Sequence, residues 1–179
     1  RDADWAFCDP RYSPDGQRVA CLASHQGLKH TMPNQLAVWQ REGGSWDVPS
    51  AQWDHAVESP LLWEDDGEAL LFIAEQQGRR HLWRFDLPDR RAEVVVAGGA
   101  VLDFGKAAGT LVTLSDSAAH QAQMQVHLPG EAPQRLETFN DTLMASLDLG
   151  RHEEVRFTGA LGDPVQMWLF YPPGFDAKK

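Results

Sequence analysis

Seven histidines are the residues of this chain that could bind a metal ion, but their spacing does not favour a metal site. Zinc sites usually place two histidines about one helical turn apart, or combine histidines with closely spaced cysteines. No His-Glu-x-x-His, His-x-His or Cys-x-x-Cys pattern occurs in the sequence. We therefore predict no metal and no other cofactor, and we assign no ligand role to the histidines at His25, His30, His55, His81, His120, His127 and His152.

Catalytic patterns are absent as well. Asp65-Asp66 is an acidic pair, but adjacent residues in a turn point apart, whereas a glycosidase needs two carboxyl groups that face each other. The glycine pairs Gly43-Gly44 and Gly98-Gly99 lack the lysine and helix that complete a phosphate-binding loop. No Gly-x-Ser-x-Gly nucleophile motif occurs. The sequence predicts no catalytic residue.

The two cysteines are expected to be free. Cys8 and Cys21 flank the turn Asp15-Gly16, so they could face each other across a hairpin. Nothing in the sequence demands a disulfide, and buried free thiols are the usual outcome in a cytosolic protein. We therefore expect two buried thiols and a cytoplasmic location.

The charge of the chain excludes two classes of partner. Its formal net charge is −10, from 26 acidic and 16 basic residues. Nucleic acids and anionic membranes both require a basic surface, so we expect neither partner. No apolar run is long enough for a membrane span. The chain starts at Arg1 without an initiator methionine or a visible signal peptide, and we expect it to be cut from a longer protein.

A short sequence motif is repeated along the chain. Tyr12 stands four residues before Gly16 and Trp63 stands four residues before Gly67, and each glycine is followed by an apolar run. A weaker third copy surrounds Gly109. The copies are 51 and 42 residues apart. A period of about 40 to 50 residues built from short strands is typical of propeller blades.

The segments between turns have the length and alternation of strands. We predict blades at about 4–50, 51–98 and 99–139, each with up to four strands. The strands are predicted at 18–23, 35–39, 69–74, 81–85, 93–97 and 109–115. In the segment 81–87 one face should carry Leu82, Arg84 and Asp86, and the other Trp83, Phe85 and Leu87.

The tryptophans are expected to divide between core and surface. Trp63 and Trp83 lie in predicted strands and should fill the space between sheets. Trp46 and Trp53 lie near turns and should be more open to a surface or interface role.

Two segments could be helical, 116–125 and 141–151. We interpret the first as a loop followed by a strand at 124–128. The second has a helical pattern but lies where a connection between strands is expected. From Glu154 onward, strands at 155–158 and 165–171 flank a turn and predict a β-hairpin. The second strand is apolar on both faces and should therefore be covered on both sides.

Five motifs follow one another along the chain, namely the turn Ser13-Pro14-Asp15-Gly16, the segment 135–140, the turn Gly162-Asp163-Pro164, the apolar strand 165–171 and the exit Pro172-Pro173-Gly174-Phe175-Asp176. In this order they resemble the prolyl oligopeptidase family of serine peptidases, in particular its acylaminoacyl-peptidase-like and dipeptidyl-peptidase-like branch. The resemblance implies the C-terminal part of a β-propeller, 1–139, followed by a linker and hairpin, 140–179. The hairpin would lead into an α/β-hydrolase domain beyond Lys179. The expected fold is all-β, a partial β-propeller of about three blades plus this hairpin.

The resemblance also implies a function. The parent would cleave peptides through an acyl-serine intermediate, and this portion would cap the active site and gate the access of peptide substrates. Its expected partners are the parent's hydrolase domain and peptide substrates. The loops at 24–34 and 116–123 are candidates for contact with substrate, by length only.

Two other functions stay open. The chain could be a non-enzymatic propeller scaffold that binds protein partners, or a carbohydrate binder that would present a surface tryptophan pair. We also expect self-association, through the hairpin 155–171 or the first blade, because open strand edges attract other chains.

Overall fold

The computed structural model describes residues 4–27 and 32–178. His30 and the middle of the predicted loop 24–34 lie outside this part of the chain. The expected all-β fold is confirmed. The strands are β1 Trp5–Tyr12, β2 Arg18–His25, β3 Gln35–Gln40, β4 Trp46–Asp47, β5 Glu58–Trp63, β6 Ala69–Gln76, β7 Arg79–Asp86, β8 Arg91–Val96, β9 Ala100–Ala107, β10 Thr110–Ser117, β11 His120–His127, β12 Gln134–Arg135, β13 His152–Thr158 and β14 Pro164–Phe170. The helical elements are α1 Asp141–Ala145 and a single 3-10 turn at Ala160–Gly162.

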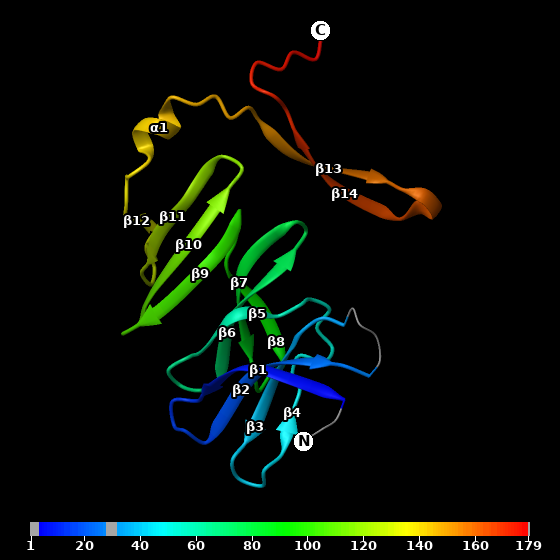
Figure 1. Ribbon diagram of the computed structural model, residues 1–179, viewed down its shortest axis with the longest axis vertical. Helices are drawn as coiled ribbons and strands as arrows, with labels where there is room; N and C mark the ends of the chain where they lie inside the picture. The colour runs from blue at the N-terminus through cyan, green and yellow to red at the C-terminus, as the bar shows by residue number, and fades with distance from the viewer. Residues whose placement is uncertain (1–3, 28–31, 179) are drawn as a thin grey trace.

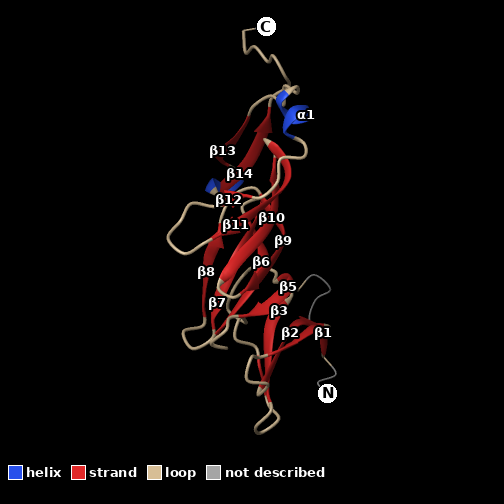
Figure 2. Ribbon diagram, turned by 90° about the vertical axis from the view of Figure 1, so that its left-hand side faces the viewer, coloured by secondary structure: helices blue, strands red, loops and turns tan. Residues whose placement is uncertain are grey.

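Twelve of these strands form three antiparallel groups, which we call blade one (β1–β4), blade two (β5–β8) and blade three (β9–β12). Within each blade the strands pair in chain order. Blades two and three are joined by one parallel pairing, between Arg80 of the inner strand β7 and Ala100 of β9. Blade one lies at one end of the molecule, and the hairpin β13–β14 lies at the other (Figure 1). Figure 2 shows the elongated shape that results. The blade boundaries 4–50, 51–98 and 99–139 stay predictions.

Strand alternation in blade two builds two separate cores. Leu70 and Phe72 point to blade one, whereas Leu71 and Ile73 point to blade three. The predicted faces of β7 are confirmed, since Leu82 packs on blade three while Trp83 and Phe85 belong to the core shared with blade one. Because side chains alternate across a strand, one sheet can supply both neighbours with apolar surface.

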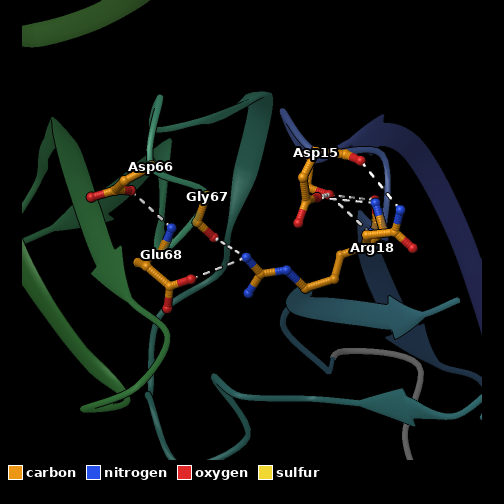
Figure 3. Close-up of polar contacts among 7 residues, drawn as sticks. Asp15, Arg18, Asp66, Gly67 and Glu68 are labelled. Atoms are coloured by element: carbon orange, nitrogen blue, oxygen red, sulfur yellow. Dashed lines mark hydrogen bonds and ion pairs between the residues drawn. The ribbon is translucent and has the colours of Figure 1, made fainter. Parts of the chain in front are cut away.

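The repeated turn holds blades one and two together. The Arg18 guanidinium donates to the Gly67 carbonyl at 2.7 Å and pairs with Glu68 at 3.2 Å (Figure 3). Its carbon Cζ lies 5.1 Å from the centre of the Trp63 ring, and the Trp63 indole N–H donates to the Arg11 carbonyl at 3.0 Å. Gly67 has a φ of +73°, which glycine adopts without steric cost. The turn therefore makes contacts between blades as well as reversing the chain.

The tryptophan predictions are confirmed in three of four cases. Trp63 and Trp83 are buried, and Trp46 is exposed and stacks on Phe7 at 4.5 Å between ring centroids. Trp53 differs from the expectation, since its ring packs edge-on against Phe72 and Trp83. The turn that carries Trp53 lies over the core between blades one and two. Trp53 is half-buried there, and its position near a turn in the sequence did not reveal this packing.

Three other local expectations need correction. The predicted loop 116–123 is a tight hairpin turn, because β10 continues to Ser117 and β11 starts at His120. The segment 141–151 forms helix only over α1 and is otherwise a connection. Both cysteines are free, but Cys8 is exposed and only Cys21 is buried. Burial raises the pKa of the Cys21 thiol to about 11.

Candidate functional site

The hairpin β13–β14 packs on the turn between β6 and β7 in blade two. The Gln77 carbonyl accepts a hydrogen bond from the Gln166 side-chain amide at 2.9 Å and one from the Trp168 indole at 3.4 Å. The Arg156 guanidinium donates to the Gln77 side chain at 2.9 Å. Gln77 and Gly78 both have positive φ, so the chain reverses within two residues and exposes this carbonyl.

Arg79 makes the second part of this contact. Its guanidinium lies 4.6 Å from the centre of the Trp168 ring and 3.5 Å from the Glu154 carboxylate. Gly78 leaves room for the indole, because a β-carbon there would approach Trp168 Nε1 to 2.9 Å. The hairpin is thus held by the Trp168 ring against Arg79, by the ion pair between Arg79 and Glu154, and by hydrogen bonds to the Gln77 carbonyl.

A cavity of about 600 Å³ lies between the hairpin and the ends of blades two and three. Three connections form its propeller side, namely the β6–β7 turn, the β8–β9 connection and the β10–β11 turn. Rings of the hairpin form the other side. The lining residues are Gly78, Arg79, Gly98, Gly99, Ala100, Asp116, Ser117, Ala118, His152, Trp168 and Phe170. We call this space the hairpin cavity.

Gly99 brings two lining segments into direct contact. Its φ is +50°, and a β-carbon there would collide with the backbone oxygen of Asp116. Its own carbonyl accepts a hydrogen bond from the Arg80 N–H at 3.3 Å. The close approach is possible because glycine has no β-carbon, and it sets the position of Asp116 beside the β8–β9 connection.

The walls of the hairpin cavity are aromatic and charged. The His152 ring stacks on Phe170 at 5.8 Å between centroids and lies 6.0 Å from Trp168. The Asp116 carboxylate makes no hydrogen bond or ion pair with any residue that the structure describes. The cavity therefore combines aromatic rings with Asp116, whose carboxylate has no partner among the described residues.

Two histidines lie in different surroundings: His81 is buried beside the β8–β9 connection, whereas His127 is half-buried at the end of β11 remote from the β10–β11 turn. His81 Nδ1 accepts a hydrogen bond from the Gly98 N–H at 3.3 Å, and His127 Nε2 lies 2.9 Å from the Thr113 hydroxyl. Burial, with a smaller contribution from Arg79, lowers the pKa of His81 below its ordinary 6.5. Burial alone lowers the pKa of His127. Both rings thus resist protonation in the folded chain.

We expect the chain to lose stability as the pH falls below about 6.5. The unfolded chain then binds protons at both histidines more readily than the folded chain does, so protonation favours unfolding. Urea unfolding at several pH values between 7.5 and 5 will measure this loss. Carboxylates protonate mainly below this range.

The matched control is a double variant, His81→Asn with His127→Gln, which cannot titrate at either position. Its free energy of unfolding should change less between pH 7.5 and 5 than that of the original chain. An equal loss of unfolding free energy between pH 7.5 and 5 in the two proteins would mean that His81 and His127 do not cause the loss.

The acidic pair Asp65-Asp66 lies in a turn, in which the Asp66 carboxylate accepts a hydrogen bond from the Glu68 N–H at 2.8 Å. Across the described ranges 4–27 and 32–178, no group of three or more His, Cys, Asp or Glu side chains could hold a metal, and no helix there has the length and apolar character needed to cross a bilayer. Our assignment of no catalytic, cofactor or metal residue stays a prediction.

The sequence indicated one segment of the hairpin cavity and not the others. The segment 116–123, proposed as a substrate-contacting loop by its length alone, supplies Asp116 to Ala118 to the lining. Arg79 and Trp168 were not singled out, because they stand in ordinary strand patterns 89 residues apart. The only available signal was the apolar second strand of the hairpin, which required a partner surface.

Comparison with known proteins gives the fold. No protein-family model matches the chain, and no curated protein matches it significantly. Among solved structures, an acylaminoacyl peptidase in complex with Z-Gly-Gly-Phe-chloromethyl ketone matches 91% of this chain and 25% of its own, with 15% identity and a TM-score of 0.69. The β-propeller domain of the Trilobed protease from Pyrococcus furiosus matches 71% of this chain and 38% of its own, with 18% identity and a TM-score of 0.57.

TolB from Acinetobacter baumannii is similar over 74% of this chain and 32% of its own, with 16% identity and a TM-score of 0.58. The chain thus spans between a quarter and two fifths of the length of these structures. The expected similarity to part of a peptidase β-propeller is confirmed at the level of the fold.

Proposed function

We propose that this chain is the non-catalytic propeller portion of a serine peptidase, where it caps the active site and gates peptide access. The observation that carries the proposal is the hairpin packed on the β6–β7 turn of blade two, where Trp168 and Gln166 bind the Gln77 carbonyl. A propeller that holds the first strands of a following domain in this way fixes that domain over its loops. The similarity to an acylaminoacyl peptidase over 91% of the chain supports the same arrangement.

Within this proposal residues 1–139 supply blades and residues 140–179 supply the linker and hairpin. The parent belongs to the acylaminoacyl-peptidase-like and dipeptidyl-peptidase-like branch and hydrolyses peptides through an acyl-serine intermediate. Its serine, histidine and aspartate lie on the hydrolase domain. That domain covers the apolar residues that the hairpin leaves exposed, Val165, Met167 and Phe170. A free exposed thiol at Cys8 is compatible with a reducing cytoplasm.

The test uses the full-length protein encoded by the gene. Trp168→Ala removes the ring under Arg79 and one donor to Gln77, so the hairpin should hold the propeller less firmly. We expect hydrolysis of a peptide of about 20 residues to rise several-fold relative to hydrolysis of a short aminoacyl-nitroanilide, measured as kcat/KM for each substrate.

Trp46→Ala is the matched control, because this tryptophan is exposed on blade one and makes no contact with the hairpin. For this variant, the ratio of kcat/KM for the long peptide to kcat/KM for the short substrate should equal that of the original protein. An unchanged ratio in Trp168→Ala would argue against gating at this contact. Serine-inhibitor-sensitive peptidase activity of the 179-residue chain alone would overturn the non-catalytic assignment.

We also propose that the isolated chain associates with itself. Blade one exposes Phe7, Tyr12 and Trp46, and the hairpin exposes Phe157 and Phe170. Apolar surface of this kind favours association when no other domain covers it. Light scattering should give a mass above that of a monomer at high concentration.

Two variants assign the contact, Phe7→Ser with Tyr12→Ser on blade one and Phe170→Ser on the hairpin. The variant that changes the associating surface should have a lower mass by light scattering than the unmodified chain. A monomeric mass for the unmodified chain at every concentration would contradict the prediction.

A propeller scaffold without a catalytic domain is the second candidate. The observation in its favour is the similarity to TolB, at a TM-score close to that of the Trilobed protease propeller. The sequence that follows Lys179 in the gene distinguishes the two functions. A Gly-x-Ser-x-Gly motif about a hundred residues on supports the peptidase, and further blades support the scaffold.

A further inference from the structure

We infer that the hairpin cavity binds the positively charged group of a peptide, a lysine or arginine side chain or a free amino group, through the carboxylate of Asp116. The inference rests on the proposed function, because it names the substrate feature that this face of the propeller would select. Three observations support it. The Asp116 carboxylate has no partner among the described residues, the Arg79 guanidinium is already paired with Glu154, and aromatic rings line the cavity.

Asp116 is the free charge of the cavity. It lies in β10 beside the β10–β11 turn, half-buried, with its backbone held against Gly99. Its carboxylate makes no hydrogen bond or ion pair with the described residues. A partly buried carboxylate that lacks an internal partner gains most from a cation that arrives from outside, because pairing there is less screened than on an open surface.

Arg79, the guanidinium that lines the cavity, is already engaged. It pairs with Glu154 and lies over the Trp168 ring. An anionic ligand would have to compete with Glu154 for this guanidinium, whereas a cationic ligand finds Asp116 without a competitor. The charges therefore favour a cation over an anion at neutral pH.

The ring faces suit the same ligand. Trp168, His152 and Phe170 line the cavity opposite the blade turns. Aromatic faces attract ammonium and guanidinium groups and also cover the apolar stem of a lysine or arginine. The volume of about 600 Å³ is enough for a few peptide residues. The net charge of −10 raises the local concentration of cations around the molecule.

The test is a titration of the 179-residue chain, followed by the amide NMR signals of Gly98, Gly99 and Ala118 at pH 7.5. Three peptides are compared, acetyl-Gly-Lys-Gly-amide, Gly-Gly-Gly-amide with its free amino group, and neutral acetyl-Gly-Gly-Gly-amide. We expect saturable shifts with at least one of the charged peptides and none with the neutral one. The charged peptide that binds identifies the source of the cation, side chain or amino terminus.

Asp116→Asn should weaken binding of the charged peptide by at least about tenfold. Asp65→Asn is the matched control, because that carboxylate lies in an exposed turn of blade two away from the cavity, and its affinity should equal that of the original chain. If Asp116→Asn does not fold, acetylation of the peptide's lysine removes the charge without changing the protein and should abolish the shifts.

Equal binding of charged and neutral peptides, unchanged affinity in Asp116→Asn, or no shifts with any peptide would each overturn the inference. The outcome is independent of catalysis, since the titration contains no hydrolase domain. Binding by the chain together with a full-length protein that lacks peptidase activity would refute the proposed function alone. Peptidase activity without this binding would refute the inference alone.

Discussion

Replacing Trp63 with alanine should lower the free energy of unfolding by about 3–5 kcal/mol. The ring is 7% exposed, fills the core between blades one and two, and donates to the Arg11 carbonyl. Its loss leaves a cavity between the sheets and removes the surface on which Arg18 lies. A domain of this size has a total stability of about 5–15 kcal/mol, so the variant will be largely unfolded in mild urea. Urea unfolding followed by circular dichroism will measure the change.

Two further variants separate the causes of this loss. Trp63→Phe keeps an aromatic ring and loses the N–H donor, so it should cost less than the alanine variant. Trp46→Ala removes a tryptophan that is 46% exposed and should cost less than either. An equal loss for Trp46→Ala and Trp63→Ala would mean that Trp63 does not hold the blades together.

Replacing Gly99 with alanine should destabilise the chain by about 3 kcal/mol, the upper end of the usual range for one substitution. A β-carbon at this position collides with the backbone oxygen of Asp116, and backbone cannot move aside as a flexible side chain can. The Arg80 hydrogen bond to the Gly99 carbonyl, which joins blades two and three, should weaken as well. Thermal and urea unfolding will measure the stability, and the amide signals of residues 98–100 will report the displacement.

The neighbouring Gly98 provides the matched control. It also has a positive φ, +96°, but a β-carbon there meets nothing within 4 Å. Gly98→Ala therefore measures backbone strain without the collision and should cost less than Gly99→Ala. Equal losses for the two variants would show that the close approach of Gly99 to Asp116 has no energetic importance.

The repeated turns illustrate how far local patterns reach. Asp15 and Asp66 each accept a backbone N–H two residues ahead, as Asp-Gly turns are expected to do. Such turns could be predicted because the interaction lies within five consecutive residues. The same patterns gave no indication that Arg18 would reach the carbonyl of Gly67, 49 residues away.

The candidate site was the least predictable feature for the same reason. Its lining comes from four separate segments, two blade turns, a connection between blades and the hairpin. Each segment looks ordinary in the sequence, and the segment that holds Asp116 was a candidate for substrate contact by its length alone. Only the packing of the hairpin on Gln77 and Arg79 turns these segments into a cavity.

By itself the sequence determined the inner strands of the blades, the alternating faces of β7, most of the turns and the resemblance to a peptidase propeller, but it did not indicate the strands β1, β5 and β9. These features depend on neighbours along the chain, through the two-residue period of strands and the backbone freedom of glycine. The tertiary structure alone decided which turn carries the hairpin, how Trp53 packs on the core between blades one and two, and which acidic residue lines a cavity. Those features depend on contacts between residues tens of positions apart, such as Arg156 with Gln77, and no periodic pattern records which distant residues will meet.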